Sequence, residues 1–400
     1  MESSKLDRRT WLKTSLVAAG GLVLAPKISL SAPTKTPTAP AKLGAKSIMW
    51  EVDYPAYHNA EPHLQARLNL NENPYGPAPS VRAAISEAIS LGNRYGHGDV
   101  ATLIEMIAEK EGVKPENIML GPGSTDLLEK TAITRFMKGG GNIVSADPSY
   151  MSLVNTSQAA GAVWKPIPLT ADYQHDLPAM EAAIDKDTKL VYVTNPNNPT
   201  ASLTDATKLR AFCSKVSAKV PVFLDEAYLE FLDNPKASSM VGLVAEGKDV
   251  IVARTFSKIH SMAGLRVGYI VATVERIKSI TDLVRSTMGL CVTSVKGAIA
   301  SMKDTAFEAN CKSLITEGRG YVCDELKKLG YAYIPSYTNF VLFPLREKQD
   351  ADPKAFNKAM VDKGVGIRIF NIANKNWGRV SIGTMDELKL FSQVFKQVTA

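Results

Sequence analysis

The sequence predicts a large α/β domain, with a mostly parallel sheet covered by helices, followed by a smaller α+β domain. Three observations predict this fold. The chain has 400 residues, 45% hydrophobic and 22% charged, which is typical of a globular protein with a substantial core. Short continuous apolar runs alternate with stretches of helical periodicity, as in parallel sheets buried on both faces. In the last third, a long helical stretch precedes shorter strands.

The first 41 residues predict an export signal followed by a linker. Arg8 and Arg9 precede an apolar run at 16–25, an order typical of a signal peptide. This run is too short to cross a bilayer core, which needs about 20 residues, so we expect no stable membrane anchor. The paired arginines resemble the twin-arginine signal of bacteria, which predicts export by that machinery to the periplasm or beyond. Residues 31–41 are rich in proline, alanine and threonine, as in linkers.

The net charge of the chain is a formal +7, from 47 basic and 40 acidic residues. Residues 1–41 contain six of the basic and two of the acidic groups, so the remainder has 41 basic and 38 acidic residues. More than half of the basicity therefore belongs to the predicted signal and linker. It gives no support for a nucleic-acid partner.

The four cysteines are Cys213, Cys291, Cys311 and Cys323. None lies in a CxxC pair or at a metal-ligand spacing from a histidine, so the sequence predicts neither a metal site nor a disulfide framework. Export would permit a bond between Cys311 and Cys323, and the sequence leaves their pairing open.

The elements follow one another in a regular order after the linker. Helical periodicity appears at 81–89 and 100–108, and apolar strands are predicted at 118–120, 143–144, 190–193, 222–224, 250–252 and 268–271. Shorter strands are predicted at 339–343, 366–370 and 379–382, with a closing helix from Asp386. We predict an N-terminal arm at 42–80, a large domain at 81–290 and a small domain at 291–400.

Polar segments follow several of these strands, where ligands collect in parallel α/β sheets. Residues 121–126, Gly-Pro-Gly-Ser-Thr-Asp, lie between a strand and a helix. Glycines there allow a phosphate to approach the backbone, and the helix N-terminus favours an anion. An ordinary capped turn explains the same residues equally well. The segment lacks the P-loop ending and the dinucleotide-binding spacing, which disfavours a nucleotide site.

Four further segments are unspecific when taken singly. Asn-Pro-Asn-Asn-Pro-Thr at 195–200 indicates a turn, and the acidic residue at 225 could be a strand-end cap. The lysine that ends Arg-Thr-Phe-Ser-Lys at 254–258 could be a solvated surface group, and Gly-Leu-Arg-Val-Gly at 264–268 leads into the next strand.

As an ordered set with Asn-Leu-Asn-Glu-Asn-Pro-Tyr-Gly-Pro at 69–77, these segments are far more specific. The chain resembles the class I/II pyridoxal-phosphate-dependent aminotransferases, and most of all their histidinol-phosphate aminotransferase branch, over roughly residues 60–397. The resemblance implies a fold type I transferase with pyridoxal 5'-phosphate as cofactor. It also implies a homodimer with shared active sites that acts on an amino acid and a 2-oxo acid.

The resemblance assigns the catalytic roles to four residues. Lys258 matches the lysine that forms the Schiff base with the cofactor. A partly desolvated lysine among cations has a lowered pKa, and it can act as a nucleophile and then as a base. Asp225 matches the carboxylate that pairs with the pyridine nitrogen of the cofactor. This pairing keeps the nitrogen protonated, so that the ring acts as an electron sink. Asn198 and Tyr228 match the groups that form hydrogen bonds to the phenolic oxygen of the cofactor.

The remaining cofactor contacts implied by the resemblance are mostly hydrogen-bond donors. Tyr150 matches the ring that stacks on the pyridine face. Tyr95 matches a tyrosine that reaches the cofactor phosphate of the neighbouring subunit, which accounts for the expected dimer. The phosphate cup is assigned to Ser124, Thr125, Thr255, Ser257 and Arg266.

The expected substrate contacts lie at the other end of the site. Arg379 matches the arginine that holds the α-carboxylate, for which a planar bidentate donor is suited. Arg368 occupies a position that also faces substrate anions, Tyr75 matches a tyrosine lining the site, and Asn339 lies at a substrate-domain position. The sequence departs from the family pattern at Ala201, 96–98, 369–371 and 375–377. These departures surround the substrate end, so the cofactor is better defined than the substrate.

The sequence favours transamination, and the alternative is a pyridoxal-phosphate-dependent cyclase, lyase or oxidase in a specialised pathway. Both would use Lys258 and Asp225. A regulatory module is disfavoured, because residues 1–60 are too short and too rich in proline and alanine for a DNA-binding domain. His97 and His260 are interpreted as structural or solvated histidines.

Overall fold

The computed structural model describes residues 46–51, 64–285, 287–346 and 352–400. The predicted signal and linker at 1–41 lie outside the described residues, as does much of the predicted arm. Every described residue belongs to one compact unit, Gly44–Ala400. In this described part, no helix has both the length and the apolar character needed to cross a membrane.

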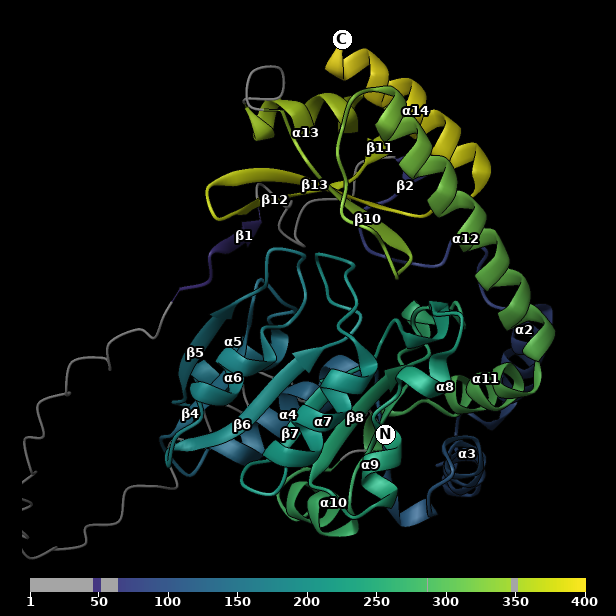
Figure 1. The fold of residues 1–400 in the computed structure, drawn as a ribbon. Helices are drawn as coiled ribbons and strands as arrows, with labels where there is room; N and C mark the ends of the chain where they lie inside the picture. The colour runs from purple at the N-terminus through teal and green to yellow at the C-terminus, as the bar shows by residue number, and fades with distance from the viewer. Residues whose placement is uncertain (1–45, 52–63, 286, 347–351) are drawn as a thin grey trace, which may run out of the picture. The chain divides into compact units, whose positions relative to one another are not determined.

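A seven-stranded sheet forms the centre of the first domain (Figure 1). Strand β9 runs antiparallel to both of its neighbours, and all the other strands of this sheet run in one direction. The predicted mostly parallel sheet is therefore confirmed. In spatial order the strands are β3 (Ile118–Gly121), β9 (Gly268–Val271), β8 (Val250–Thr255), β7 (Val222–Asp225), β6 (Thr188–Thr194), β4 (Asn142–Asp147) and β5 (Val163–Pro168).

Successive residues of each strand enter different cores, because side chains alternate between the two faces of a sheet. Val222 and Leu224 join one hydrophobic cluster, whereas Phe223 joins another. The first face is covered by α3 (His97–Glu111), α7 (Ala206–Val216), α9 (Val241–Ala245) and α11 (Val292–Lys303). The second is covered by α4 (Ser124–Phe136), α5 (Ser152–Ala159) and α10 (Val274–Thr281). The apolar runs are therefore continuous because both faces are buried.

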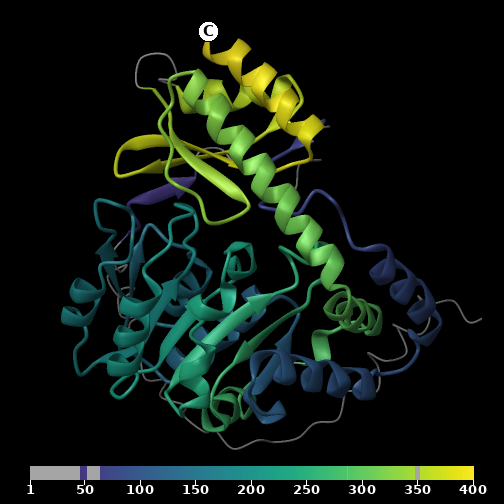
Figure 2. The ribbon, with the colours of Figure 1, turned by 45° about the vertical axis from the view of Figure 1, so that its right-hand side comes forward.

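The second domain is built on an antiparallel sheet with the order β1-β12-β13-β10. Its own core contains Phe343, Phe391 and Phe395. The strands are β1 (Met49–Glu51), β12 (Arg368–Ile372), β13 (Lys375–Ser381) and β10 (Phe340–Pro344), and β2 (Ala66–Arg67) pairs with β11 (Val365–Gly366). The helices are α12 (Thr305–Lys328), α13 (Pro353–Asp362) and α14 (Met385–Thr399). Figures 1 and 2 show α12 running from this domain toward α11.

Shorter elements complete the described chain. They are α2 (Pro79–Ala88), α6 (Leu177–Ala182) and α8 (Pro235–Ser238), with 3-10 turns at Ile89–Leu91, Pro115–Asn117, Leu229–Phe231, Ala263–Leu265 and Thr287–Gly289. Helix α11 packs on α2 and α3, and its Val295 and Ala298 join a core cluster of the first domain. The division of the chain at residues 290 and 291 stays a prediction.

A short N-terminal segment at 46–51 contacts both domains. In the first domain, Ser47 Oγ and the Ile48 backbone N–H donate to the carboxylate of Asp147 at 2.6 and 2.7 Å. In the second, β1 pairs antiparallel with β12. The segment therefore bridges the end of β4 and the edge of the small sheet.

The four cysteines are free thiols. Cys311 and Cys323 both lie on α12, 12 residues apart in the sequence. This spacing corresponds to roughly 18 Å along a helix, at a rise of about 1.5 Å per residue. A disulfide requires Cα atoms within about 7 Å, so this helix excludes a bond between the two within one chain.

Candidate active site

A cavity of about 350 Å³ lies at the carboxyl ends of the central strands and is closed by residues of the small sheet. Twelve of the fifteen predicted site residues line it. Tyr75, Tyr95 and Asn339 do not. The strand-end residues meet here because parallel strands end at the same edge of a sheet.

The phosphate-cup candidates form one wall of the cavity. Ser124 and Thr125 begin α4 directly after Gly123, whose φ is +86°. A Cβ at Gly123 would clash with the guanidinium of Arg266, and a Cβ at Gly268 would lie 2.5 Å from the Ser124 backbone nitrogen. The two glycines therefore allow α4 and Arg266 to approach each other closely. The result is a cradle of donors at a helix N-terminus, which suits a phosphate.

Hydroxyl groups and one cation complete this cradle. Arg266 Nη1 donates to Ser257 Oγ at 3.4 Å, and Thr255 Oγ1 donates to Ser257 Oγ at 3.0 Å. Arg266 is held from behind by the Ala263 carbonyl at 2.8 Å. These groups can all donate hydrogen bonds to an anion.

Lys258 follows β8 and points across the cavity. Its Nζ donates to the Asn71 carbonyl oxygen at 3.0 Å and lies 5.7 Å from the ring centre of Tyr228. Burial, reinforced by the nearby cation of Arg379, lowers the pKa of Lys258 to about 8. Its amine is therefore much easier to deprotonate than that of an exposed lysine, as a nucleophile or proton carrier requires.

Asp225 ends β7 and is 4% exposed. One oxygen accepts from the Ala227 backbone N–H at 3.1 Å. Burial raises the pKa of Asp225 to about 6, although the Ala227 N–H and the charge of Lys258 oppose this shift. Among the described residues it forms no ion pair. A buried carboxylate of this kind is suited to a cationic ring nitrogen, which would favour its charged form.

Two tyrosines, Tyr150 and Tyr228, line the same cavity as Lys258 and Asp225. Tyr150 lies with its hydroxyl 3.2 Å from Thr125 Oγ1. The Tyr228 hydroxyl accepts from Asn71 Nδ2 at 3.1 Å, and burial raises the pKa of Tyr228 to about 12. It therefore stays a neutral hydrogen-bonding group at physiological pH.

Arg379, on β13, lies at the opposite end of the cavity with neutral partners. Its Nη1 donates to Asn198 Oδ1 at 2.8 Å and its Nη2 to the Asn69 carbonyl at 3.1 Å, whereas its buried Nε has no hydrogen-bond partner in the described part of the chain. Burial, together with repulsion from Arg368, lowers the pKa of Arg379 to about 9. A buried cation without a carboxylate partner among the described residues provides a site for an anion.

Arg368 also lines the cavity, and it lies directly opposite Arg379 in the β12–β13 register. Unlike Arg379, it is paired with a carboxylate. Its Nε and Nη2 donate to the two oxygens of Glu51 at 2.5 and 2.6 Å. The two arginines of the site therefore differ in their availability to a ligand.

The three predicted residues outside the cavity have different positions. Tyr75 packs against the small-domain core, and Tyr95 is 78% exposed beside His97. Asn339 lies behind the cavity and donates to the carbonyls of Asn71 and Glu72 at 3.1 and 3.2 Å. His260 is buried, and its Nδ1 lies 3.0 Å from Ser301 Oγ.

Asn71 is a site residue that the sequence reasoning did not single out. It has a φ of +55°, and its carbonyl accepts from both Lys258 and Asn339. Its side chain joins Tyr228 to Ser381, whose hydroxyl donates to Asn71 Oδ1 at 3.1 Å. The signal available in the sequence was the conspicuous Asn-Glu-Asn-Pro segment at 71–74, since asparagine tolerates left-handed backbone.

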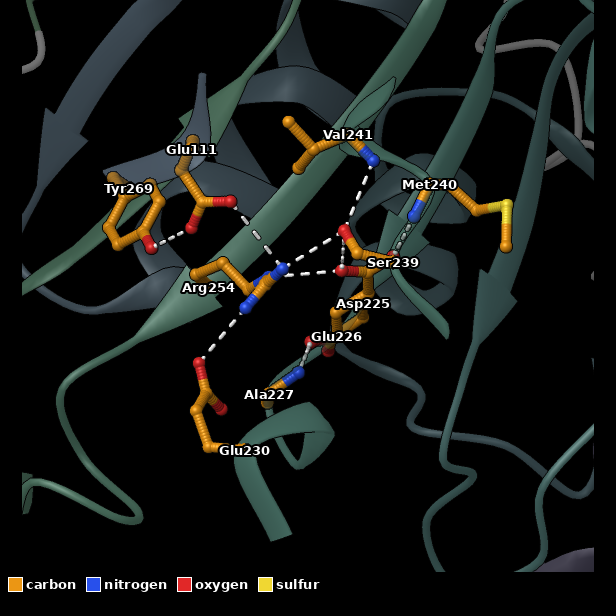
Figure 3. A network of polar contacts seen from close by, with 10 residues as sticks. All are labelled: Glu111, Asp225, Glu226, Ala227, Glu230, Ser239, Met240, Val241, Arg254 and Tyr269. Carbon is orange, nitrogen blue, oxygen red and sulfur yellow. Dashed lines mark hydrogen bonds and ion pairs between the residues drawn. The ribbon is translucent and has the colours of Figure 1, made fainter. Parts of the chain in front are cut away.

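Figure 3 shows a buried ionic network next to Asp225, which the sequence reasoning also missed. Arg254 contacts Glu226 and Glu230 at 3.0 Å each and Glu111 at 3.6 Å, and no side chain among them is more than 8% exposed. Burial raises the pKa of both Glu226 and Glu230, and Arg254 opposes this. Glu226 follows Asp225 and Arg254 precedes Thr255, so the network ties together two strand ends of the site.

The residues of this cavity fit pyridoxal 5'-phosphate. The cradle offers donors to a phosphate, Asp225 is a buried carboxylate suited to a ring nitrogen, and Lys258 is a lysine with a lowered pKa. Together, the fold and this cavity define a fold type I pyridoxal-phosphate-dependent enzyme.

Comparison with known proteins identifies the family within this class. The model for "Aminotransferase class I and II" matches residues 65–394, and the chain belongs to that family. Histidinol-phosphate aminotransferases of Moorella thermoacetica and Brevibacillus brevis are 34% and 36% identical to it. The alignments cover 84% and 83% of this chain and 85% and 90% of those proteins.

Solved structures agree with this assignment. A putative histidinol-phosphate aminotransferase from Erwinia carotovora atroseptica has a TM-score of 0.77 at 30% identity, over 83% of this chain and 95% of that one. The Sinorhizobium meliloti histidinol-phosphate aminotransferase, solved with pyridoxal-5'-phosphate, has a TM-score of 0.77 at 28% identity, over 84% and 91%. The protein is thus a pyridoxal-phosphate-dependent transaminase that acts on amino acid and oxo acid substrates.

Proposed function

We propose that this chain is an exported aminotransferase in which Lys258 carries the cofactor and moves the substrate proton, and Arg379 binds the substrate carboxylate. The observation that carries this assignment is that Lys258 and Asp225 line the same cavity as a cradle of phosphate donors. The lowered pKa of Lys258 and the raised pKa of Asp225 support complementary roles.

When bound, the cofactor supplies an aldehyde for covalent attachment and an aromatic ring that withdraws electrons from the substrate. The neutral Lys258 amine attacks as a nucleophile and later accepts and returns a proton at Nζ. Asp225 keeps a cation at the ring nitrogen, and Arg379 orients the carboxylate with two parallel N–H groups. Asn198 and Tyr228 line the cavity between Asp225 and Arg379, where they would form hydrogen bonds to the cofactor and fix its orientation.

The test is the visible absorbance of purified protein loaded with pyridoxal phosphate. We expect Lys258→Ala to abolish the covalently bound signal and to reduce turnover by at least about 10³-fold, the scale of proton-transfer catalysis. Lys358→Ala is the control, because the Lys358 side chain is 73% exposed. Ping-pong kinetics with a panel of amino donors then identifies transamination. Wild-type protein without the absorbance would contradict the proposal.

We propose a homodimer whose active sites are shared through Tyr95. Ile89 and Leu91, which lie four to six residues before it in the sequence, are also 66% and 44% exposed. Apolar side chains gathered on a surface are typical of an interface. A dimer measured by light scattering supports this arrangement, and a monomer with full activity would contradict it.

We also propose that residues 1–41 direct twin-arginine export to the periplasm or beyond. This route carries folded proteins, which suits an enzyme loaded with its cofactor before export. Cell fractionation should find the wild type outside the cytoplasm, and the double variant Arg8→Lys with Arg9→Lys inside it. Equal cytoplasmic amounts of both proteins would contradict export.

Export suggests a specialised pathway rather than histidine synthesis, although the relatives are named for histidinol phosphate. The test is deletion of the gene. We expect normal growth without histidine. Histidine auxotrophy in a strain with no second such gene would overturn this part of the proposal.

A further inference from the structure

The cavity contains two arginines that face each other across one pair of strands. Arg368 on β12 and Arg379 on β13 are direct partners in the register. Like charges at such positions repel each other, because their side chains project from the same face of the sheet. The charge of Arg368 accordingly contributes to the lowered pKa of Arg379.

Glu51 compensates one of these charges. Both of its oxygens accept from Arg368, in a bidentate pair whose side chains are 24% and 25% exposed. Among the described residues, the hydrogen-bond partners of the Arg379 side chain are the neutral groups of Asn198 and Asn69. Glu51 therefore compensates the charge of Arg368, and the charge of Arg379 stays available to a ligand.

Contacts with both domains fix the position of the segment that carries Glu51. Met49 to Glu51 pair with β12 in the register Met49 with Ile372 and Glu51 with Phe370. The preceding Ser47 and Ile48 hold the carboxylate of Asp147, three residues before Tyr150 of the cavity wall. These anchors keep the Glu51 backbone beside β12, where its carboxylate reaches Arg368, so a second substrate anion would have to compete with Glu51 for that arginine.

We propose that Glu51 is a specificity-determining residue that competes with a second substrate anion for Arg368. The enzyme then favours substrates whose only anionic group is the carboxylate bound by Arg379. This inference rests on the proposed function, because it takes Arg379 as the carboxylate site. A substrate with a distal carboxylate or phosphate must break the bidentate pair, and it also meets the negative charge of Glu51.

The test compares two ligands that differ by one carboxylate, glutarate and pentanoate, in calorimetric titrations of the holoenzyme. We expect Glu51→Gln to tighten glutarate binding by about two- to fivefold, the scale of a partly exposed ion pair, and to change pentanoate binding less. Glu116→Gln, at an exposed position outside the cavity, is the control and should change neither. The ratio of kcat/KM for glutamate to that for norvaline should rise by the same factor.

A double-mutant cycle assigns the effect to Arg368. In an Arg368→Gln background, Glu51→Gln should no longer alter the preference. If Glu51→Gln leaves the preference between glutarate and pentanoate unchanged, the inference is overturned. Weaker glutarate binding overturns it too, because Glu51 would then position Arg368 for the second anion. If pentanoate binding does not depend on Arg379, tested with Arg379→Gln, the carboxylate site itself is wrong and both proposals fail.

Discussion

Arg254 Nε donates to Glu226 Oε2 at 3.0 Å, and this buried pair joins the ends of two strands that carry the site. Glu226 follows Asp225 on β7, and Arg254 immediately precedes Thr255 on β8. The ion pair thus lies one residue away from a cofactor-binding candidate on each strand. Its loss should disturb both stability and the site.

Arg254→Met should destabilise the protein by about 3–5 kcal/mol, because it leaves buried carboxylates without their cation. Arg210→Met is the matched control. The pair of Arg210 with Glu246 has side chains 42% and 54% exposed, so its loss should cost at most about 1 kcal/mol. Urea unfolding measures both. Equal losses in the two variants would show that the network contributes no more than a surface ion pair.

Asp225→Asn should stabilise the cofactor-free protein at neutral and alkaline pH while abolishing tight cofactor binding. Burial raises the folded-state pKa of Asp225 to about 6, above its ordinary value of 3.8. The protonated form is therefore favoured by folding, and its contribution is complete below pH 3.8 and is lost as pH rises through 6. The amide avoids this loss, which amounts to up to about 3 kcal/mol for a shift of two pKa units.

Thermal unfolding of cofactor-free protein at a series of pH values checks this prediction. The advantage of Asp225→Asn should grow between pH 4 and pH 7. Asp362→Asn, whose side chain is 58% exposed, should show no such trend. An advantage of Asp225→Asn that is independent of pH would mean that the charge of Asp225 is not the cause.

Cofactor uptake by the cofactor-free protein should accelerate as pH rises, with a midpoint near the pKa of Lys258, about 8. The neutral amine is the nucleophile, so the reactive fraction increases with pH. Arg379→Met should move the midpoint upward, because the Arg379 charge helps to lower the pKa of Lys258. Arg379→Lys retains the charge and should move it less. A wild-type midpoint near 10.5, the ordinary lysine value, would contradict the assignment.

Gly123→Ala should weaken cofactor binding by at least about 100-fold. The new methyl group would clash with the Arg266 guanidinium at a backbone position with a φ of +86°. Gly320→Ala is the control, since a Cβ on this exposed position of α12 meets nothing within 4 Å. It should leave binding unchanged and stabilise the helix by up to about 1 kcal/mol. Equilibrium titration with pyridoxal phosphate distinguishes the two variants.

Tyr95→Phe should weaken cofactor retention by about tenfold without dissociating the proposed dimer, because it removes only a hydroxyl that would bind a charged phosphate across the proposed interface. Tyr337→Phe changes another exposed tyrosine, 42% exposed, and serves as control. Dialysis followed by absorbance measures retention. If both variants retain the cofactor as the wild type does, Tyr95 has no part in the shared site.

The parallel core could be predicted because its strands are buried on both faces and therefore read as unbroken apolar runs. Residues 222–224 are such a run, and Asp225 was predicted at its end. Strand β5 was missed for the opposite reason. It lies at the edge of the sheet, and its sequence includes Lys165, Pro166 and Pro168, which are tolerated only where no further strand must pair.

The ionic network and the Glu51 contact could not be predicted from local pattern. The charges of the network come from three segments of the chain, which contain Glu111, Glu226 with Glu230, and Arg254, and each charge alone is indistinguishable from a solvated one. Glu51 meets Arg368 across 317 residues of sequence. Glu226 and Arg254 adjoin the motifs that contain Asp225 and Lys258, but those motifs do not show that the two charges pair, and only the folded chain brings them together.

The pairing of β1 with β12 has a further consequence for solubility. It makes β12 an internal strand and leaves the three-residue β1 at the margin of the small sheet. Without β1, the longer β12 would present unpaired backbone groups along an apolar strand that contains Ile369, Phe370 and Ile372. Exposed edges of this kind recruit strands from other molecules. The same short segment that holds Glu51 against Arg368 therefore also protects the enzyme from edge-to-edge aggregation.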